Sequence, residues 1–462
     1  MKPISANTLL KGLGEAARDF DVTAVVTDSR AVCPGSVFVC IRGERADGHD
    51  FAVSAAENGA GAVLVQHPVE GLAPEKTVFV SDPLDAMIAM GRNYRDRFSR
   101  CTVLGVTGSV GKTTTKEFCA AVFSAFGNTI KTQGNQNNEL GVPNTLFSIG
   151  DDTDYAVVEM GMQGLGEIQK LTLAARPAGA IISCIGRAHL EQLGTRENIL
   201  KAKMEICDGM PAGAPLVLNG DDDYLPSARV PGRLHPVYFS LSDHNADVTA
   251  SGVFVSASGT RFRLRDKEFG SYDVTIPAMG EHNVRNALSA YALATRLGLD
   301  PAAAARALSQ YRTTGHRQNI THHAGVTVIE DCYNANPDSM KAALRTLEAY
   351  PTQGRRIAVL GDMFELGAIS DAAHTQLGED AAQSSVAFLI TVGEAARLTH
   401  RRAVALGVPA VHCADKKDAA ALLISYCEPD DVVLVKASHG MAFETILDDL
   451  YAALDVRKDG SV

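Results

Sequence analysis

The chain has no tryptophan, and only 6% of its 462 residues are aromatic. Its nine cysteines are an odd number and form no C-x-x-C pair, which argues against both a disulfide framework and a zinc site. Positive charge is not in excess, since the formal net charge is −11, and this disfavours nucleic acid or an anionic membrane as the main partner. No run of about 18 apolar residues occurs, so no membrane span is expected. We therefore expect a cytoplasmic protein.

The remaining composition, 46% hydrophobic and 21% charged, is that of a globular protein long enough for several domains. Strand-like and helix-like stretches alternate, which predicts α/β units with mostly parallel sheets. We expect three of them: a small N-terminal α/β domain (1–84), a central P-loop, ATPase-like domain with a parallel sheet (85–313), and a Rossmann-like C-terminal domain (314–462). Residues 236–276, rich in β-branched and polar side chains, are expected to form an antiparallel addition.

A glycine loop, TGSVGKTT at residues 107–114, lies between a predicted strand and a predicted helix. Glycines let backbone N–H groups surround phosphate oxygens, and the helix start adds positive partial charge. Lys112 can then reach the outer phosphates, and Thr113 can offer a hydroxyl to magnesium. The strict P-loop pattern would have glycine where Val106 stands, so the alternative is an ordinary strand–helix turn with an incidental lysine. The helix that follows should bury Phe118, Ala121, Val122 and Ala125.

Three further polar residues follow predicted strands or lie on a predicted helix. Glu159 ends the apolar segment YAVVEM, on the side where parallel sheets bind ligands, and its carboxylate could hold magnesium. The alternative is a strand-end acid that faces solvent. His189 and Lys203, taken alone, are more typical of a structural histidine and a solvated helix lysine, and their spacing does not bring them together.

Several motifs resemble the Mur ligases in order and spacing: TGSVGKTT, VVEMG, IGRAHLEQLGTRENILKAKMEI and EHNVRNALSA. Members of that family form amide bonds in peptidoglycan synthesis with the energy of ATP. Other segments, above all GNQNNELGVP and DCYNANPDSM, are similar to the branch that joins D-alanyl-D-alanine to UDP-N-acetylmuramoyl-tripeptide. The resemblance therefore implies those two small molecules and ATP as substrates, an acyl-phosphate intermediate, and a monomer.

The resemblance implies a catalytic group of Lys112, Glu159, His189 and Lys203. It implies magnesium, two ions, held by Thr113, Glu159, His189 and a carbamate on Lys203. The implied ATP site comprises Thr107, Gly108, Ser109, Val110, Gly111, Lys112, Thr113, Thr114, Asn283, Arg317 and Asp331. The implied substrate contacts are Ser29 and Arg30 for the uridine-diphosphate end, Asn135, Asn137 and Asn138 for the peptide, and Asn334, Asn336, Lys436 and Ser438 in the C-terminal domain.

Two segments depart from the family pattern, at three positions. Ala437 and His439 stand in VKASHG, where the family usually has V-K-G-S-R, and His316 stands where a second glycine is common.

Rival interpretations are a ligase that adds the third amino acid, a polyglutamate-type ligase, a nucleotide-binding regulator and a motor or transport ATPase. DCYNANPDSM argues against the first two. A regulator is disfavoured by the combination of Lys112, Glu159, His189 and Lys203. The N-terminal GERADGHDF segment and the late Rossmann-like domain argue against a motor. The sequence leaves open whether the tripeptide ends in diaminopimelate or lysine.

Overall fold

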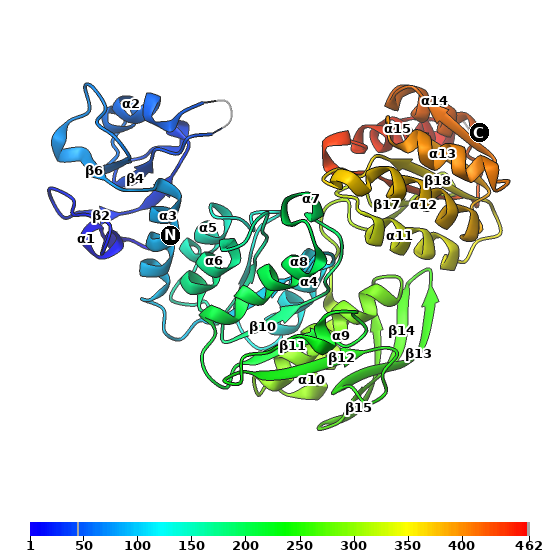
Figure 1. Cartoon of the computed structure of the whole chain (residues 1–462), viewed down its shortest axis with the longest axis horizontal. Coiled ribbons are helices and arrows are strands. Elements are labelled where there is room, and N and C mark those ends of the chain that lie inside the picture. Colours follow the sequence, from blue (N-terminus) through cyan, green and yellow to red (C-terminus); the bar gives the residue numbers. More distant parts are fainter. Residues whose placement is uncertain (44–45, 460–462) are drawn as a thin grey trace.

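The computed structural model describes residues 1–43 and 46–459. Figure 1 shows three lobes that follow one another along the chain, from the N-terminal lobe (blue) through the middle (cyan to green) to the C-terminal lobe (yellow to red). Each lobe contains a mainly parallel sheet with helices packed on it. The predicted fold class is therefore confirmed. The exact domain boundaries stay predictions.

The N-terminal lobe is built on a four-stranded parallel sheet in the order β3-β4-β5-β6. A short antiparallel pair, β1 and β2, precedes it, and α3 leads out of it toward the middle of the chain. The strands are β1 (Ile4–Ser5), β2 (Asp21–Val22), β3 (Ala24–Val26), β4 (Ser36–Val39), β5 (Ala62–Val65) and β6 (Thr77–Phe79); the helices are α1 (Ala6–Leu9), α2 (Ala52–Glu57) and α3 (Pro83–Arg95).

The middle lobe holds a nine-stranded sheet in the order β15-β14-β13-β12-β11-β10-β7-β9-β8. Its strands are β7 (Thr102–Thr107), β8 (Thr129–Lys131), β9 (Tyr155–Glu159), β10 (Gly179–Ile182), β11 (Pro215–Asn219), β12 (His235–Ser240), β13 (Val248–Ser256), β14 (Gly259–Asp266) and β15 (Gly270–Ile276). Its helices are α4 (Lys112–Ser124), α5 (Gly141–Phe147), α6 (Glu167–Ala175), α7 (Leu190–Leu193), α8 (Arg196–Met204), α9 (Glu281–Arg296) and α10 (Pro301–Ala307).

The C-terminal lobe has a six-stranded sheet in the order β16-β17-β21-β18-β19-β20, in which β16 alone is antiparallel to its neighbour. Its strands are β16 (Asn319–His323), β17 (Val326–Glu330), β18 (Arg356–Gly361), β19 (Phe388–Val392), β20 (Ala410–Cys413) and β21 (Val432–Lys436). Its helices are α11 (Pro337–Ala349), α12 (Ser370–Gln383), α13 (Ala396–Ala405), α14 (Lys416–Tyr426) and α15 (Glu444–Asp459).

Short 3-10 helices occur between these elements, at Ser29–Ala31, Gly48–Phe51, Pro74–Lys76, Glu205–Gly209, Leu225–Ser227, Leu308–Gln310, Gly367–Ile369 and His439–Met441. Within residues 1–43 and 46–459, no helix combines the length and the apolar character that crossing a membrane requires.

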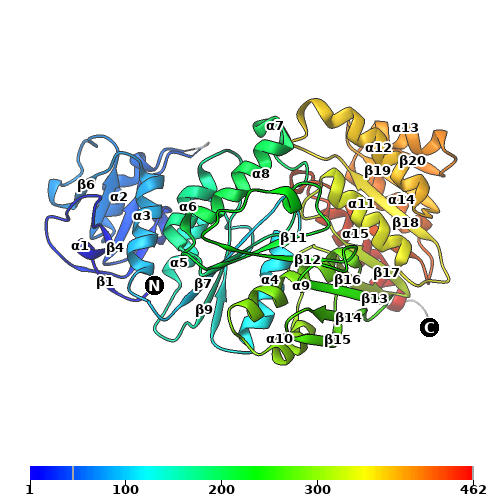
Figure 2. The same ribbon diagram turned by 60° about the horizontal axis from the view of Figure 1, so that its bottom comes forward.

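The central sheet is buried on both faces, and the strand period of two explains how. In β7, Val103 packs into the core that contains α5, α6 and α8, whereas Leu104 and Val106 pack into the core under α4 and α9. Figure 2 shows helices on both sides of this sheet. The first core also reaches α3 and the N-terminal sheet, so that these two lobes share apolar packing.

Two details differ from the sequence interpretation. Ala125 is exposed, because α4 ends at Ser124 and the chain turns before the next apolar contact; Phe123 is buried instead. The segment 236–276 is antiparallel only from β13 onward, since β12 is parallel to both β11 and β13.

Candidate active site

The glycine loop connects β7 to α4, as predicted. Gly111 is the residue before the helix and has a φ of +84°, in the left-handed region that favours glycine. A Cβ atom added there would lie 2.9 Å from Oδ1 of Asn286, so there is little room for a side chain. The first N–H groups of α4 have no partner within the helix, and together with the loop they form a site suited to an anion.

Lys112 folds back over this loop. Its ammonium donates to the carbonyl oxygen of Gly108 over 2.9 Å. Burial lowers the pKa of Lys112; the charge of Glu159 opposes this shift and that of Arg317 adds to it. A lysine cation and helix N–H groups thus point to the same small volume, which is the arrangement that phosphate binding needs.

Glu159 lies beside the loop because β7 and β9 are neighbours in the sheet, with Val106 paired to Glu159. Its Oε1 atom accepts hydrogen bonds from the hydroxyl of Thr113 (3.2 Å) and the amide of Asn137 (2.8 Å). Its Oε2 atom lies 3.6 Å from Nζ of Lys116 and accepts no hydrogen bond from the described residues. The predicted strand-end carboxylate is therefore buried at the phosphate loop rather than exposed to solvent.

The fold brings His189 and Lys203 to the same place, which their sequence spacing did not indicate. Burial lowers the pKa of His189 to about 4, and the positive charges of Lys112 and Lys203 act in the same direction. His189 is therefore neutral at physiological pH, and its Nδ1 atom lies 3.3 Å from Oε2 of Glu365 in the C-terminal lobe. Lys203, on α8, is only 1% exposed, and burial followed by the Lys112 charge lowers its pKa well below the ordinary value.

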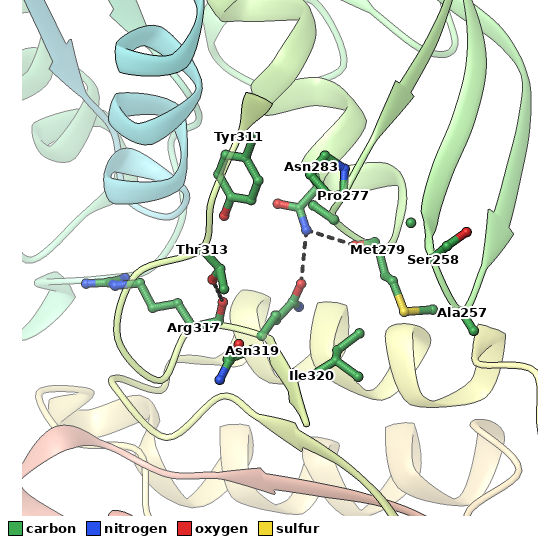
Figure 3. Close-up of a pocket in the computed structure, with 13 residues that line it drawn as sticks. Ala257, Ser258, Pro277, Met279, Asn283, Tyr311, Thr313, Arg317, Asn319 and Ile320 are labelled. Carbon is green, nitrogen blue, oxygen red and sulfur yellow. Dashed lines mark hydrogen bonds between the residues drawn. The ribbon is translucent and has the colours of Figure 1, made fainter. Parts of the chain in front are cut away.

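A cavity of about 170 Å³ lies where the tip of the β13–β14 hairpin meets the segment that leads into the C-terminal lobe. Asn283 lines it, and its amide donates to the backbone oxygen of Met279 (2.8 Å) and to Oε1 of Gln318 (3.1 Å), as Figure 3 shows. Tyr311 and Arg317 line the cavity as well, but the Arg317 guanidinium extends away from the labelled group. That guanidinium lies 3.7 Å from the ring centre of Tyr333, a close cation–π contact.

The residues predicted in the C-terminal lobe mostly bind one another. Lys436 is 2% exposed and pairs with Asp331, with 2.7 Å between Nζ and Oδ2, and it also donates to the carbonyl oxygen of Asn334 (2.9 Å). Ser438 accepts from the backbone N–H of Phe364 (2.9 Å), and Asn336 caps the start of α11. The departures from the family pattern fit here too: Ala437 is buried, His439 stacks on Tyr333 with ring centres 5.3 Å apart, and His316 pairs with Glu330 over 2.8 Å.

The other predicted substrate residues lie outside this cluster. Ser29 and Arg30 are in the N-terminal lobe, at the far end of the molecule from the C-terminal lobe (Figure 1), and Arg30 pairs there with Asp28. Asn135 and Asn138 are exposed on the loop after β8, whereas their neighbour Asn137 reaches Glu159.

Four residues at the site were missed from the sequence: Lys116, Asn286, Tyr333 and Glu365. Asn286 is one helical turn from Asn283 and accepts from the hydroxyl of Thr115 (3.2 Å), so its spacing within EHNVRNA was a usable signal. Lys116, Tyr333 and Glu365 reach the site through contacts between distant segments, and the sequence offered no signal for those contacts.

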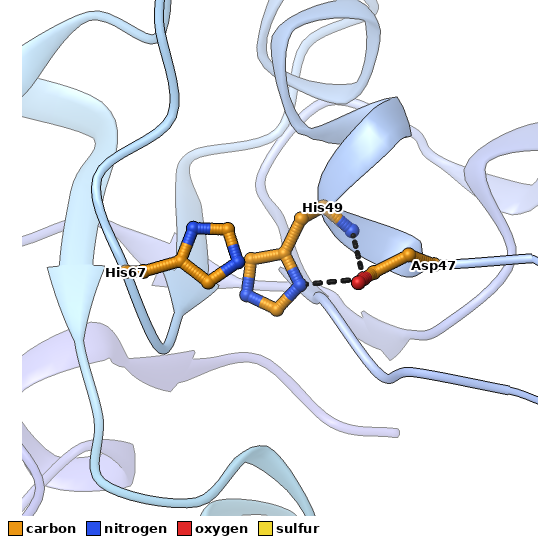
Figure 4. A group of neighbouring side chains, drawn as sticks. All are labelled: Asp47, His49 and His67. Carbon is orange, nitrogen blue, oxygen red and sulfur yellow. Dashed lines mark hydrogen bonds and ion pairs between the residues drawn. The ribbon is translucent and has the colours of Figure 1, made fainter.

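A group of possible metal ligands in the N-terminal lobe, Asp47, His49 and His67, is shown in Figure 4. Nδ1 of His49 lies 2.7 Å from Oδ1 of Asp47, and its Nε2 accepts from the backbone N–H of Gln66 (3.0 Å). Both ring nitrogens of His49 are thus in use, and the ring stacks on His67. This group fits a structural role better than a metal site.

Comparison with known proteins agrees with this architecture. The family model "Mur ligase middle domain" matches residues 106–294, "Mur ligase, glutamate ligase domain" matches 316–439, and "Mur ligase family, catalytic domain" matches 21–90. The chain belongs to the Mur ligase family.

Within the family, one branch is matched along almost the whole chain. A protein of Escherichia coli (strain K12) named UDP-N-acetylmuramoyl-tripeptide–D-alanyl-D-alanine ligase is 37% identical over 93% of this chain and 94% of its own length. The protein of that name from Bacillus subtilis (strain 168) is 35% identical over 93% of each chain. MurF from Acinetobacter baumannii superimposes with a TM-score of 0.90 at 30% identity, covering 98% of this chain and 99% of its own. MurF ligase from Thermotoga maritima, solved in complex with ADP, gives a TM-score of 0.84 at 29% identity over 94% and 98%. The predicted resemblance is confirmed.

Proposed function

We propose that this chain joins D-alanyl-D-alanine to UDP-N-acetylmuramoyl-tripeptide at the expense of ATP, a step of peptidoglycan synthesis. The relatives that match it over nine-tenths of its length carry the name of this activity. The observation that carries the proposal is the position of Glu159, since one buried carboxylate joins Thr113 of the phosphate loop to Asn137 of the loop proposed to face the peptide. A ligase needs this juxtaposition, because phosphate and acceptor must react with each other.

ATP is proposed to bind with its phosphates on the loop and its base in the neighbouring cavity. The loop segment Thr107–Thr114 and Lys112 supply N–H groups and one cation, and Asn283 supplies an amide at the cavity. The charge of Arg317 contributes to the lowered pKa of Lys112, which supports the proposal that its guanidinium shares the triphosphate charge. Asp331, fixed by Lys436, is proposed to complete the site from the C-terminal lobe. That the related MurF ligase from Thermotoga maritima was solved with ADP supports this proposal.

The donor atoms present fit magnesium. Oε2 of Glu159 is a buried carboxylate oxygen without a hydrogen bond from the described residues, and the Thr113 hydroxyl is beside the same carboxylate. The carboxylate and hydroxyl oxygens are the ligands that this hard cation prefers, and neutral His189 could add a ring-nitrogen lone pair. Thr113, Glu159, His189 and a carbamate on Lys203 would hold the metal, which when bound would offset the phosphate charge.

Lys203 suits carbamylation for a physical reason. Carbon dioxide reacts with a neutral amine, and the depressed pKa of Lys203 favours that form. The product carries oxygen and negative charge beside Lys112, where an ammonium would meet repulsion.

In the proposed reaction, the terminal carboxylate of the tripeptide attacks the γ-phosphorus of ATP and the bond to ADP breaks. Lys112 offsets the repulsion between these anions. The dipeptide amine then attacks the acyl carbon, and inorganic phosphate leaves with the carbonyl restored. The peptide is proposed to be oriented by Asn137 and by the exposed Asn135 and Asn138. The uridine-diphosphate end is proposed to be held by Ser29 and Arg30. Asn334, Asn336, Lys436 and Ser438 are proposed to shape the loops that receive the dipeptide.

The test is phosphate release from ATP with purified UDP-tripeptides ending in diaminopimelate or lysine, with and without D-alanyl-D-alanine. We expect one phosphate per pentapeptide formed, only when both substrates are present, and mass spectrometry of the products identifies the accepted tripeptide. Phosphate release that ignores the dipeptide would instead indicate a motor or a regulator. A monomeric state and a cytoplasmic location remain predictions.

A further inference from the structure

Lys116 is a buried lysine that the reaction as described leaves without a role. It lies on α4 one turn after Lys112 and is 1% exposed. Burying an ammonium costs free energy unless charged or polar partners compensate. Replacing such a lysine with an apolar residue leaves those partners unpaired. The partners of Lys116 therefore indicate what it is for.

Those partners come from three separate segments. Nζ of Lys116 lies 3.6 Å from Oε2 of Glu159 on β9 and 3.5 Å from Oε1 of Glu117 on α4, and it donates to the carbonyl oxygen of Gly134 over 3.3 Å. Gly134 begins the acceptor loop, defined here as residues 134–138. One ammonium thus touches the proposed metal carboxylate and the segment proposed to face the peptide.

The acceptor loop has a second attachment at Asn137. Its amide donates to Glu159 over 2.8 Å, and its carbonyl oxygen accepts from the N–H of Gly161 over 2.7 Å. The intervening Asn135 is exposed. The loop is therefore held at two points, one through Lys116 and one through Glu159, with exposed side chains between them.

We propose that Lys116 is a positioning residue that holds the acceptor loop against Glu159, so that the peptide substrate and the phosphate loop stay in register. This inference rests on the proposed function for the identity of the acceptor. The claim that Lys116 orders residues 134–138 without contributing to nucleotide binding does not depend on the proposed function.

The matched control is Lys131. It pairs with the same carboxylate, Glu117, but is half-buried on β8 and has no ion pair with Glu159 among the described residues. Lys131→Met therefore removes a lysine and an ion pair while leaving both attachments of the acceptor loop in place.

The experiment compares Lys116→Met, Lys116→Arg and Lys131→Met by steady-state kinetics, by calorimetric binding of ADP and by amide hydrogen exchange. For Lys116→Met we expect about a tenfold rise in KM for the UDP-tripeptide, faster exchange confined to residues 134–138, and ADP binding within twofold of the parent. Lys116→Arg, which keeps a cation and a donor, should restore most of the loss, and Lys131→Met should match the parent.

Unchanged exchange and unchanged KM in Lys116→Met would overturn the proposal, and so would a loss of ADP binding as large as the rise in KM. If Lys116→Met does not fold, the double variant Lys116→Met/Glu117→Gln removes one charge of each sign, and the same exchange result is expected. If the parent protein fails to join the two substrates, the proposed function is rejected, while exchange and ADP binding still decide the role of Lys116.

Discussion

Lys203 carries its amino group into the interior of the protein, and burial together with Lys112 disfavours its charged form. In residues 1–43 and 46–459 its ammonium has no ion-pair partner, unlike Lys116 and Lys436. A buried lysine whose charged form is disfavoured beside another cation is disposed to react rather than to pair. At the scale of single residues, this is the feature that most clearly separates an enzyme site from a structural ion-pair network.

Lys203→Ala removes the nitrogen on which the carbamate would form. We expect kcat to fall about a hundredfold or more, because a group that helps to hold charge at the transferred phosphate typically contributes several kcal/mol. Formate or acetate should restore part of the activity, since a small carboxylate can fill the space. Lys201→Ala, an exposed neighbour on α8, is the control and should keep full activity. Full activity of Lys203→Ala would reject the carbamate assignment.

The ring of Tyr333 contacts two side chains. The guanidinium of Arg317 is 3.7 Å from the ring centre, and His439 stacks on the ring. Tyr333→Leu removes the aromatic face, and a cation–π contact of about 1 kcal/mol corresponds to roughly a fivefold loss. We expect ADP to bind about three- to fivefold more weakly, as measured by calorimetry. Tyr333→Phe keeps the ring and should bind ADP normally; an equal loss in both variants would show that the hydroxyl matters instead.

At the scale of elements, the junction of β7 and α4 requires glycine twice over, through its backbone angle and through the proximity of Asn286. Gly111→Ala should destabilise the protein by about 1–2 kcal/mol and weaken ADP binding at least tenfold, because the left-handed backbone is strained and the new methyl group displaces the loop. Gly166, which precedes α6 with a φ of +88° and has nothing within 4 Å of an added Cβ, is the matched position. Gly166→Ala should lower the melting temperature by less, because only the backbone angle is strained there, and should leave ADP binding unchanged.

The elements that the sequence predicted well are those whose signals are local. The glycine loop is such a case, because its strand, glycines, lysine and helix are adjacent in the sequence. The hydrophobic period and the residue types were therefore sufficient to predict it. Ala125 was wrong because the helix end depends on a turn that the apolar period does not encode.

Lys116 was missed for a different reason. Its partners Glu159 and Gly134 become neighbours only because β9 lies between β7 and β8 in the sheet, an order that no local pattern specifies. For the same reason His189 and Lys203 could be associated only through family resemblance. The helix cap at Asn336 is different, because Pro337 at the first helical position and Ser339 three residues on are a local signal that was available in the sequence.

At the scale of the whole molecule, the C-terminal lobe meets the middle lobe through polar contacts near the site and through Met279, which packs into the apolar core of the C-terminal lobe. The N–H of Arg187 donates to Asp338 at the start of α11 over 3.2 Å, His189 approaches Glu365, and Thr314 donates to Glu117 over 3.3 Å. Partly exposed polar contacts of this kind can form and break as ligands come and go. The residues proposed to hold the uridine-diphosphate end lie in the other outer lobe, so the acceptor must span from that lobe to the phosphate loop.

An acyl phosphate hydrolyses readily, and water must therefore be excluded while the amine enters. A non-hydrolysable ATP analogue together with UDP-tripeptide should draw the three lobes closer, because each ligand is proposed to contact two of them. We expect the radius of gyration from small-angle X-ray scattering to fall when both ligands are present, and to fall less with either alone. Asp338→Ala removes a hydrogen-bond acceptor between the middle and C-terminal lobes, so it should reduce the ligand-induced fall in the radius of gyration. The N-terminal lobe packs on the middle lobe through other residues, so its position should not change in this variant. A radius that does not change with both ligands bound would count against closure and would leave the exclusion of water to the loops around Glu159 and Glu365.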